Sequence, residues 1–422
     1  MSKDKTPSQP VPQLRFPEFR DAAPWVPTSL AKAFRTITNG KANAQDHDED
    51  GKYPLFDRSE TIKRSPAYMF DADAVILPGE GAHFTPRRFS GKFNLHQRAY
   101  ALMDCSEDID FTYYALDEGK GRLANKAVQS TVRSLRMPII EKFTIACPDP
   151  AEQRKIAECL GSLDDWIAAE TEALETLRRH KTGLMQQLFP RPGETRPRLR
   201  FPEFKDGPAW DTPAMSDIYG FRPTNSLSRD QLNYDEGMIY NIHYGDIHTK
   251  FQSQFRIENE RVPRVLPAIA EELGDRLHLC QEGDIILADA SEDLNDVGKA
   301  IELISLGGQR VVSGTHTIHA TRLGDKPTLG FGGYLFQSAA VRRGIQKEAQ
   351  GAKVYGISPT RIASVPLPMP PTTNEQSKIA ECLGSLDAQI LAQSETLAGL
   401  REHKRGLMQQ LFPAPDTAEG GG

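Results

Sequence analysis

Basic and amide side chains gather in one stretch of the first half of this sequence. Between Arg58 and Arg98 there are seven Lys and Arg residues against four Asp and Glu residues, a local excess of three positive charges. Lys and Arg bind phosphates, and Asn and Gln amides pair with purine edges. The candidates for such contacts are Arg87, Arg88, Lys92, Asn94 and Gln97. The alternative interpretation is a solvated basic loop.

Motifs for nucleotide, methyl-donor and metal chemistry are missing or weak. The sequence has no phosphate-binding Gly-Lys loop and no Asn- or Asp-Pro-Pro-aromatic methylation motif. Residues 46–51, with Asp57 at the twelfth position, match the start of a calcium loop, but Pro54 interrupts it and favours a solvated acidic turn. His316 and His319 would point to opposite faces of a strand, so they would not share a metal ion. We expect neither catalytic residues nor a metal site here.

Three patterns occur twice and divide the chain into two comparable halves. Each half holds a divergent segment between near-constant ones, which indicates a duplicated frame with different inserts. The first copies are Leu14–Asp21, Glu152–Asp164 and Gly183–Pro190, and the second copies are Leu199–Asp206, Glu375–Asp387 and Gly406–Pro413. Trp25 recurs as Trp210 at the offset of the first pattern.

Apolar residues recur at spacings of four and three along both later patterns, as in the a and d positions of a coiled coil. Residues 152–188 would form a helix about 55 Å long at about 1.5 Å per residue. So narrow an apolar stripe needs a partner, and we predict that the two copies pair antiparallel with Glu170 opposite Gln393. The predicted seam is Ile156, Leu160, Leu163, Ile167, Glu170, Leu174, Leu177, Ile379, Leu383, Leu386, Ile390, Gln393, Leu397 and Leu400.

The segments between the repeats are predicted to mix α and β structure. Short apolar runs bounded by turn residues predict strands at 74–77, 98–103, 238–242, 284–287, 300–303 and 315–320. The predicted fold class is α+β, with two mixed α/β domains separated by two long antiparallel coiled-coil helices in a pseudo-twofold repeat. The predicted boundaries are 14–150 for the first domain, 151–190 for the first helix, 199–373 for the second domain and 374–413 for the second helix.

Composition places the chain among globular proteins and limits how it could bind nucleic acid. Its 422 residues carry a net charge of −6, so a polycation that coats DNA is excluded and any DNA-binding face must be local. Five cysteines form no Cys-x-x-Cys pair, and an odd number argues against a disulfide framework. Residues 1–13 lack the apolar core of a secretory signal, so we expect a cytoplasmic location.

Taken together, the repeated motifs resemble the specificity (S) subunit of type I restriction-modification systems. The similarity is strongest in the two Glu-Gln-x-Lys-Ile-Ala-Glu-Cys-Leu-Gly-Ser-Leu-Asp segments, which lead to Leu-Met-Gln-Gln-Leu-Phe-Pro and follow a Leu-Arg-Phe-Pro-Glu-Phe opening. It extends from Leu14 to Pro413. Segments similar to target-recognition motifs lie at 91–100, 240–247, 283–287 and 353–357, with 130–135 at the place of the last motif in the first domain.

The resemblance implies that each domain is a target-recognition domain that reads one half of a bipartite, asymmetric DNA site, and that the helices set the gap between the halves. It also implies a non-catalytic subunit that assembles with adenine methyltransferase (M) subunits and an ATP-dependent restriction and translocation (R) subunit. S-adenosylmethionine, ATP and Mg are then expected on those partners, and no cofactor is expected on this chain.

The recognition motifs add DNA-binding candidates to the five basic and amide residues above. Asn241 and Tyr244 could equally pack or cap a turn. The added candidates are Arg133 in the first domain, and Asn241, His243, Tyr244, Lys250, Ser313, His316 and Lys353 in the second.

Two other classes of protein remain as hypotheses. The chain could be a coiled-coil scaffold that does not read DNA, or a fragment of a single-chain restriction-methylation enzyme. Missing methyl-donor and nuclease motifs argue against the fragment, and unequal inserts in matching frames argue against the scaffold.

Overall fold

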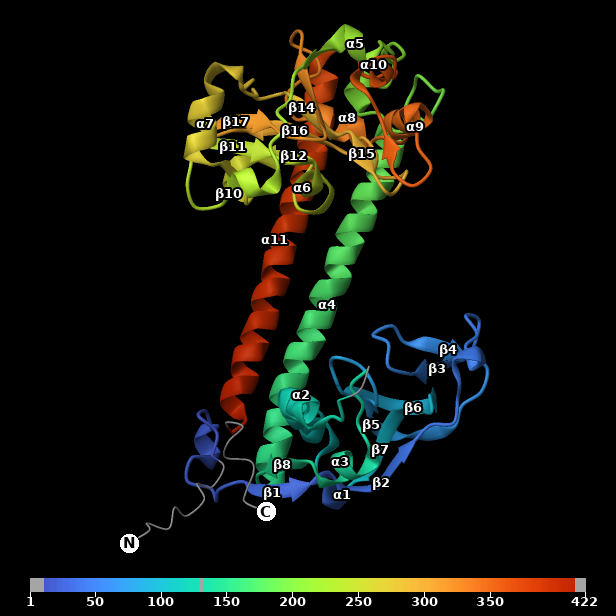
Figure 1. Cartoon of the computed structure of the whole chain (residues 1–422). Helices are drawn as coiled ribbons and strands as arrows, with labels where there is room; N and C mark the ends of the chain where they lie inside the picture. The colour runs from blue at the N-terminus through green and yellow to red at the C-terminus, as the bar shows by residue number, and fades with distance from the viewer. Residues whose placement is uncertain (1–10, 130–131, 414–422) are drawn as a thin grey trace. The chain divides into compact units, whose positions relative to one another are not determined.

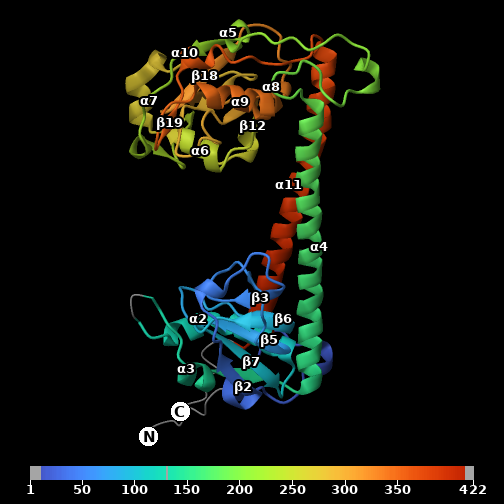
Figure 2. The ribbon, with the colours of Figure 1, turned by 90° about the vertical axis from the view of Figure 1, so that its right-hand side faces the viewer.

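A computed structural model describes residues 11–129 and 132–413 (Figures 1 and 2). The chain divides into two compact units: unit 1 comprises residues 1–172 and 394–422, and unit 2 comprises residues 173–393. The two predicted long helices are confirmed as α4 (Pro150–Leu188) and α11 (Thr373–Leu411). Each unit therefore contains one mixed α/β domain, which corresponds to a predicted recognition domain, and one half of each long helix, so the helices do not form a separate body.

Unit 1 is built on a six-stranded sheet. Its elements are β1 (Val26–Ser29), α1 (Leu30–Ala33), β2 (Phe34–Asn39), β3 (Tyr53–Phe56), β4 (Lys63–Ser65), β5 (Phe70–Pro78), β6 (Arg87–Leu95), β7 (Ala99–Cys105), α2 (Ile109–Lys126), α3 (Met137–Lys142), β8 (Thr144–Cys147) and the first half of α4. The strand order is β2-β7-β5-β6-β3-β4, and β1 pairs separately with β8. Alternate side chains of β5 enter two cores, Val75 and Leu77 on the helix side and Ala74 and Ile76 on the other.

Unit 2 contains a five-stranded and a four-stranded sheet. Its elements are α5 (Met215–Ile218), β9 (Tyr219–Arg222), β10 (Leu232–Asn233), β11 (Ile239–Ile242), α6 (Tyr244–Thr249), β12 (Gln254–Arg256), β13 (Arg264–Val265), α7 (Pro267–Leu273), β14 (Ile285–Ala288), β15 (Ala290–Ser291), β16 (Ala300–Ser305), β17 (Arg310–Ser313), β18 (Thr317–Arg322), α8 (Phe331–Gln337), α9 (Ala339–Glu348), β19 (Tyr355–Gly356) and α10 (Pro359–Ile362). The strand orders are β12-β16-β14-β18-β9 and β10-β13-β11-β17, while β15 pairs with β19. Mixed α and β domains are thus confirmed.

The end of α11 lies in the core of the first α/β domain, and the end of α4 lies in the core of the second. In unit 1, Phe412 follows α11 and packs against Trp25 and Phe111, with ring centroids 6.0 and 5.5 Å away. Such edge-on and tilted ring pairs add to the stabilisation that burial itself provides. The equivalent triad in unit 2 is Phe189, Trp210 and Phe331.

In each unit, a carboxylate on one long helix joins the other long helix to the α/β domain. In unit 1, Tyr114 donates a hydrogen bond to Asp164 on α4 at 2.7 Å, and Lys404 on α11 donates to the same carboxylate at 2.5 Å. Because the start of α4 thereby meets the end of α11, the predicted antiparallel pairing is confirmed. The corresponding residues in unit 2 are Tyr334, Asp387 and Lys181.

The repeated opening segments are held by buried ion pairs. Arg15 donates two hydrogen bonds to Glu152 at the start of α4, at 2.8 and 2.5 Å, and the two side chains are only 6% and 1% exposed. Its remaining donors bind the carbonyls of Ala22 and Ala23. Unit 2 repeats this arrangement with Arg200 and Glu375.

The predicted seam is buried, but it serves more than helix pairing. All fourteen seam side chains are buried or half-buried. Ile156 and Leu160 belong to the core of unit 1, and Ile379 and Leu383 belong to a core of unit 2. At its ends the seam is therefore part of the domain cores, which corrects its interpretation as a helix-to-helix contact throughout.

The central polar positions of the seam are only partly explained. Glu170 accepts a hydrogen bond from the indole of Trp166, one turn earlier on α4, at 2.8 Å. Its pairing with Gln393 stays a prediction.

Some local expectations need correction. His316 lies outside β18 in a turn, with a φ of 54°, so only His319 is on the strand. Helix α2 was not predicted, although Asp108 caps it by accepting hydrogen bonds from two backbone N–H groups. In the acidic turn, carboxylates of Asp46 and Asp48 accept hydrogen bonds from nearby backbone N–H groups, as expected of a solvated turn. In the motif 130–135, the first two residues lie outside the described residues.

Cysteine chemistry and membrane segments can be checked directly. All five cysteines are free thiols, as the sequence predicted. Among the described helices, none has the length and apolar character needed to cross a bilayer.

The buried ion pairs make a testable prediction about stability. Arg15→Met should lower the free energy of unfolding by about 3–5 kcal/mol, because Glu152 would stay buried without its counter-charge. The double variant Arg15→Met/Glu152→Gln should recover much of that loss. Urea unfolding measures both, with Arg178→Ala as a control, since Arg178 and Glu175 form an exposed pair that contributes under about 1 kcal/mol. Equal effects at Arg15 and Arg178 would contradict the interpretation.

Candidate nucleic-acid interface

Four of the predicted DNA-binding residues of unit 1 lie on β6. Gln97 follows in the turn to β7, and Arg133 lies in the segment before α3. Side chains two apart on a strand share a face, so Arg88 and Lys92 face the same way. The structure thus places these residues along β6 and in the turn that follows it. The carbonyl of Arg133 accepts a hydrogen bond from the N–H of Gly81, in the loop before β6.

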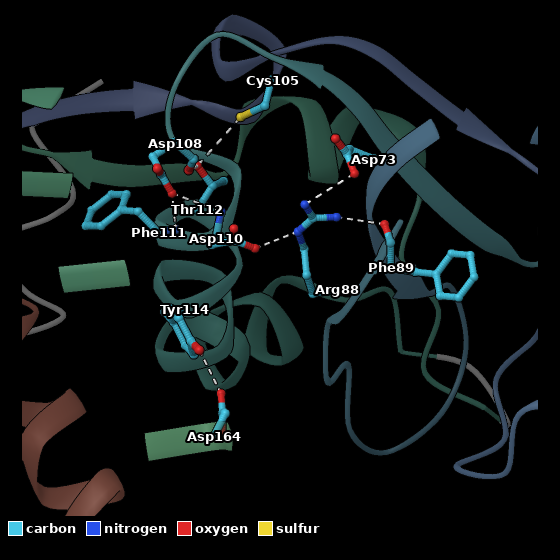
Figure 3. A network of polar contacts seen from close by, with 10 residues as sticks. All are labelled: Asp73, Arg88, Phe89, Cys105, Asp108, Asp110, Phe111, Thr112, Tyr114 and Asp164. Atoms are coloured by element: carbon cyan, nitrogen blue, oxygen red, sulfur yellow. Dashed lines mark hydrogen bonds and ion pairs between the residues drawn. The ribbon is translucent and has the colours of Figure 1, made fainter. Parts of the chain in front are cut away.

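Arg88 is held by acidic neighbours (Figure 3). Its Nε donates to Asp110 on α2 at 2.6 Å, and its Nη2 lies 3.4 Å from Asp73 on β5. Nη1 donates to the carbonyl of Phe89 at 2.7 Å. The side chain is positioned rather than free, and it keeps 23% of its surface exposed.

Two of the predicted DNA-binding side chains of unit 1 form hydrogen bonds within the protein. Arg87 donates to the carbonyls of Ser59 and Glu60 at 2.6 and 2.7 Å, which fixes the loop after β3. Asn94 donates to the hydroxyl of Ser65 at 3.0 Å. The residues with exposed side chains are Lys92, Gln97 and Arg133.

A cavity of about 790 Å³ lies between the start of β6, α2 and α4. Arg87, Arg88 and Arg154 line it, but they face five carboxylates. An excess of negative charge repels the phosphate backbone. The lining of this cavity therefore does not suit contact with DNA phosphates. The five carboxylates are Asp108, Asp110, Glu158, Asp164 and Asp165.

In unit 2, predicted residues from two distant segments come together. The ring of Tyr244, at the start of α6, lies 5.2 Å from that of His316 in the turn before β18. His243 packs beside Tyr244 with ring centroids 4.7 Å apart. His316 is 59% exposed, and its Nδ1 lies 3.3 Å from a carboxylate oxygen of Asp289. We call Tyr244, His316 and Asp289 the aromatic–acid cluster.

Two of the predicted DNA-binding residues, Asn241 and His243, are buried near this cluster. Asn241 accepts a hydrogen bond from the amide of Asn225 at 2.8 Å, and the same amide donates to the carbonyl of Ser313. His243 accepts a hydrogen bond from the N–H of Gly245 and so caps α6. Burial, reinforced by the nearby charge of Arg229, lowers the pKa of His243. The neutral ring is therefore favoured, as capping requires.

A charged group flanks the cluster and contains a residue that sequence reasoning missed. Arg229 donates two hydrogen bonds of 3.0 Å to Asp246, and Lys250 contacts the same carboxylate at 2.8 Å. Asp246 is fully buried, whereas both cations are about half exposed. Burial raises the pKa of Asp246, but the bonds from the two cations outweigh it and hold the pKa below its usual range.

Lys353 and Asp289 precede two strands that pair with each other in unit 2. The side chain of Lys353 is exposed just before β19, and β19 pairs with β15 directly after Asp289. Burial raises the pKa of Asp289, although His316 opposes the shift. Nothing in the sequence motifs pointed to Arg229 or Asp289, because their partners lie 17 and 27 residues away in the chain.

Comparison with known proteins connects this geometry to a family. The family model described as the type I restriction modification DNA specificity domain matches residues 24–179. The type I restriction enzyme EcoDI specificity subunit of Escherichia coli is 30% identical over 153 residues, which is 36% of this chain and 34% of that protein. Residues 24–179 of this chain are therefore similar to the DNA specificity domain of type I restriction-modification systems. The matched part spans about a third of the length of this curated relative.

Two solved structures share the fold of this chain. The S subunit of the type I restriction-modification system from M. genitalium has a TM-score of 0.63 at 15% identity, over 96% of this chain and 99% of that one. A structure described as the basis of complex assembly and conformational transition of the type I R-M system gives 0.52 at 12% identity, over 92% and 98%. At these identities the likeness concerns the fold alone.

The buried Asp246 of unit 2 predicts a pH dependence of stability. Because its pKa is lower in the folded chain than in the unfolded one, its contribution to stability is complete above about pH 4 and is lost as the pH falls through the folded pKa. Asp246→Asn should destabilise unit 2 by about 1–3 kcal/mol at pH 7, since Arg229 and Lys250 lose their counter-charge. It should also weaken the acid dependence of unfolding.

Denaturant titrations from pH 3 to pH 7 measure both effects. Asp235→Asn, which alters an exposed carboxyl of the same unit, is the control. Parallel pH profiles of the Asp246 variant and the unaltered chain would contradict the assignment.

Proposed function

We propose that this chain is a type I restriction-modification specificity subunit that reads a bipartite, asymmetric DNA target, with one half-site for each recognition domain. The observation that carries the proposal is the difference between the two domains on the same frame. The aromatic triads and the Tyr–Asp–Lys contacts repeat in both units, whereas the sheets differ in strand number and order. A frame of this kind presents two different surfaces through equivalent contacts, as an asymmetric target requires.

The exposed residues suit direct reading of bases. Lys92 and Gln97 in unit 1 and the aromatic–acid cluster in unit 2 combine donors, acceptors and a ring, which are the groups that contact base edges in a major groove. The scaffold hypothesis explains the frame but gives no reason for two different exposed surfaces, so it is not favoured.

The proposed partners follow from the same reading. DNA modification and cleavage would belong to M and R subunits, with S-adenosylmethionine, ATP and Mg bound there, and this chain would contribute no catalytic residue. Its negative net charge of −6 supports this division, because affinity for DNA grows with the number of neutralised phosphates. The work would take place in the cytoplasm, where chromosomal DNA is accessible to the complex.

Substitutions in the two domains should alter different halves of one methylated motif. Lys92→Ala should relax the first half-site and His316→Ala the second, because each removes an exposed side chain from only one domain. A lost base contact reduces discrimination by about 1–3 kcal/mol. Methylome sequencing of a host that carries each variant with M subunits measures the outcome, with Arg178→Ala on α4 as control. Unchanged motifs in both variants, or changes in both halves from either one, would contradict the proposal.

The paired helices are proposed to set the gap between the half-sites. Duplicating residues 166–172 in α4 and the equivalent 389–395 in α11 adds one heptad to each and preserves the a and d pattern. The complex should then prefer a longer gap while both half-site sequences stay the same. Binding to duplexes with gaps of graded length tests this, and an unchanged preference would show that the helices do not determine the gap.

A further inference from the structure

Three potential metal ligands meet in the interior of unit 2. Cys280, Asp284 and His319 are all buried, and one donor atom from each lies within 4.8 Å of the others. Across residues 11–129 and 132–413, no other three His, Cys, Asp or Glu side chains form such a group. The group lies apart from the aromatic–acid cluster, whose His316 is exposed.

The backbone of three strands fixes the positions of these ligands. Cys280 donates its N–H to Val311 on β17 at 2.8 Å. Asp284 ends a turn in which its carboxylate accepts a hydrogen bond from the N–H of Gln281 at 2.8 Å, directly before β14. His319 lies on β18, paired with Ile286 of β14. The side chains are therefore held in place by the sheets.

The hydrogen bonds at this place are incomplete. One imidazole nitrogen of His319 lies 2.7 Å from Asp284, but Nδ1 is buried without a hydrogen-bond partner. The hydroxyl of Ser313 is also buried and lies next to the thiol of Cys280. Burying a polar group without a partner is costly, and an unsatisfied group in a native fold calls for a ligand or another explanation. A hydrogen bond between Asp284 and His319 alone leaves Nδ1 of His319 without a partner.

We infer that Cys280, Asp284 and His319 bind a structural divalent transition-metal ion of the zinc class. A mixed set of sulfur, nitrogen and oxygen donors suits Zn²⁺ and Co²⁺ and does not suit Mg²⁺ or Ca²⁺. On binding, Cys280 releases its proton to solvent, Asp284 binds as the carboxylate and His319 binds as neutral imidazole. A water molecule or the hydroxyl of Ser313 completes a tetrahedral set.

The geometry needs only small adjustments to reach this arrangement. Zinc bonds of about 2.0–2.3 Å place two ligand atoms roughly 3.3–3.6 Å apart. The Asp–His contact of 2.7 Å has to open, and the widest of the donor separations, none above 4.8 Å, has to close by about 1 Å. Such a site would join β14, β17 and β18. The turn that carries His316 connects the last two of these strands.

Metal content of the purified full chain tests the inference independently of DNA binding. We expect about one zinc per chain by mass spectrometry after growth with zinc. Cobalt substitution should give a sulfur-to-cobalt absorption band in the near ultraviolet. A chelator should lower the melting temperature of the unaltered chain. Absence of both zinc and the cobalt band in the unaltered chain overturns the inference, whatever happens to any variant.

Variants assign the ligands. Cys280→Ser should abolish the cobalt band and the chelator effect, whereas Cys147→Ser, at a buried thiol of unit 1, should retain both. Because a core variant can fail to fold, Asp284→Asn serves as a second variant, with circular dichroism as the check on folding. A folded Cys280→Ser or Asp284→Asn chain that binds metal as the unaltered chain does would also overturn the inference.

Discussion

The structure depends on burial of the end of each long helix inside a recognition domain. Phe412 and Phe189 each complete an aromatic triad, and neighbouring Leu411 and Leu188 are almost fully buried. A helix with one narrow apolar stripe is only marginally stable on its own in water, because most helix stability in proteins comes from tertiary packing. The domains thus stabilise the helices, and each domain core is incomplete without the end of a helix from the other half of the chain.

This constraint explains where the sequence is constant and where it varies. The repeated residues supply two members of each aromatic triad, the Arg–Glu pairs and the Asp–Lys contacts, all of them buried or half-buried at equivalent places. Removing one partner of a buried pair is strongly destabilising, so these positions tolerate little change. The exposed surfaces at Lys92 and at His316 take no part in those contacts. They are free to differ without loss of the frame.

The frame could be predicted from sequence, and much of the candidate interface could not. The heptad spacing located α4 and α11, because a duplicated frame repeats its residues. The repeats also contain Trp25 and Phe189, but no aromatic contact was predicted from them. Phe111 and Phe331 occupy equivalent places without any shared motif, since they belong to the divergent inserts. Residue type alone also could not distinguish side chains that are exposed to a ligand from side chains that form hydrogen bonds within the protein. Arg87, Asn94, Asn241 and Ser313 have the chemistry of DNA contacts, yet their polar atoms face the protein's own backbone and side chains or its interior.

Charge adds a further consequence for how such a chain recognises DNA. Cations in both units have acidic neighbours, as Arg88 has Asp110 and Lys250 has Asp246. Pairing fixes these side chains and reduces their attraction for phosphates at a distance, because non-specific affinity follows the number of phosphates neutralised. Pre-positioned donors lose little conformational freedom on contact with a matching base edge. For the proposed function, an acidic chain with paired cations is therefore better suited to discriminating between DNA sequences than to binding DNA non-specifically. In the proposed complex, partner subunits would have to supply most of the non-specific affinity for the phosphates.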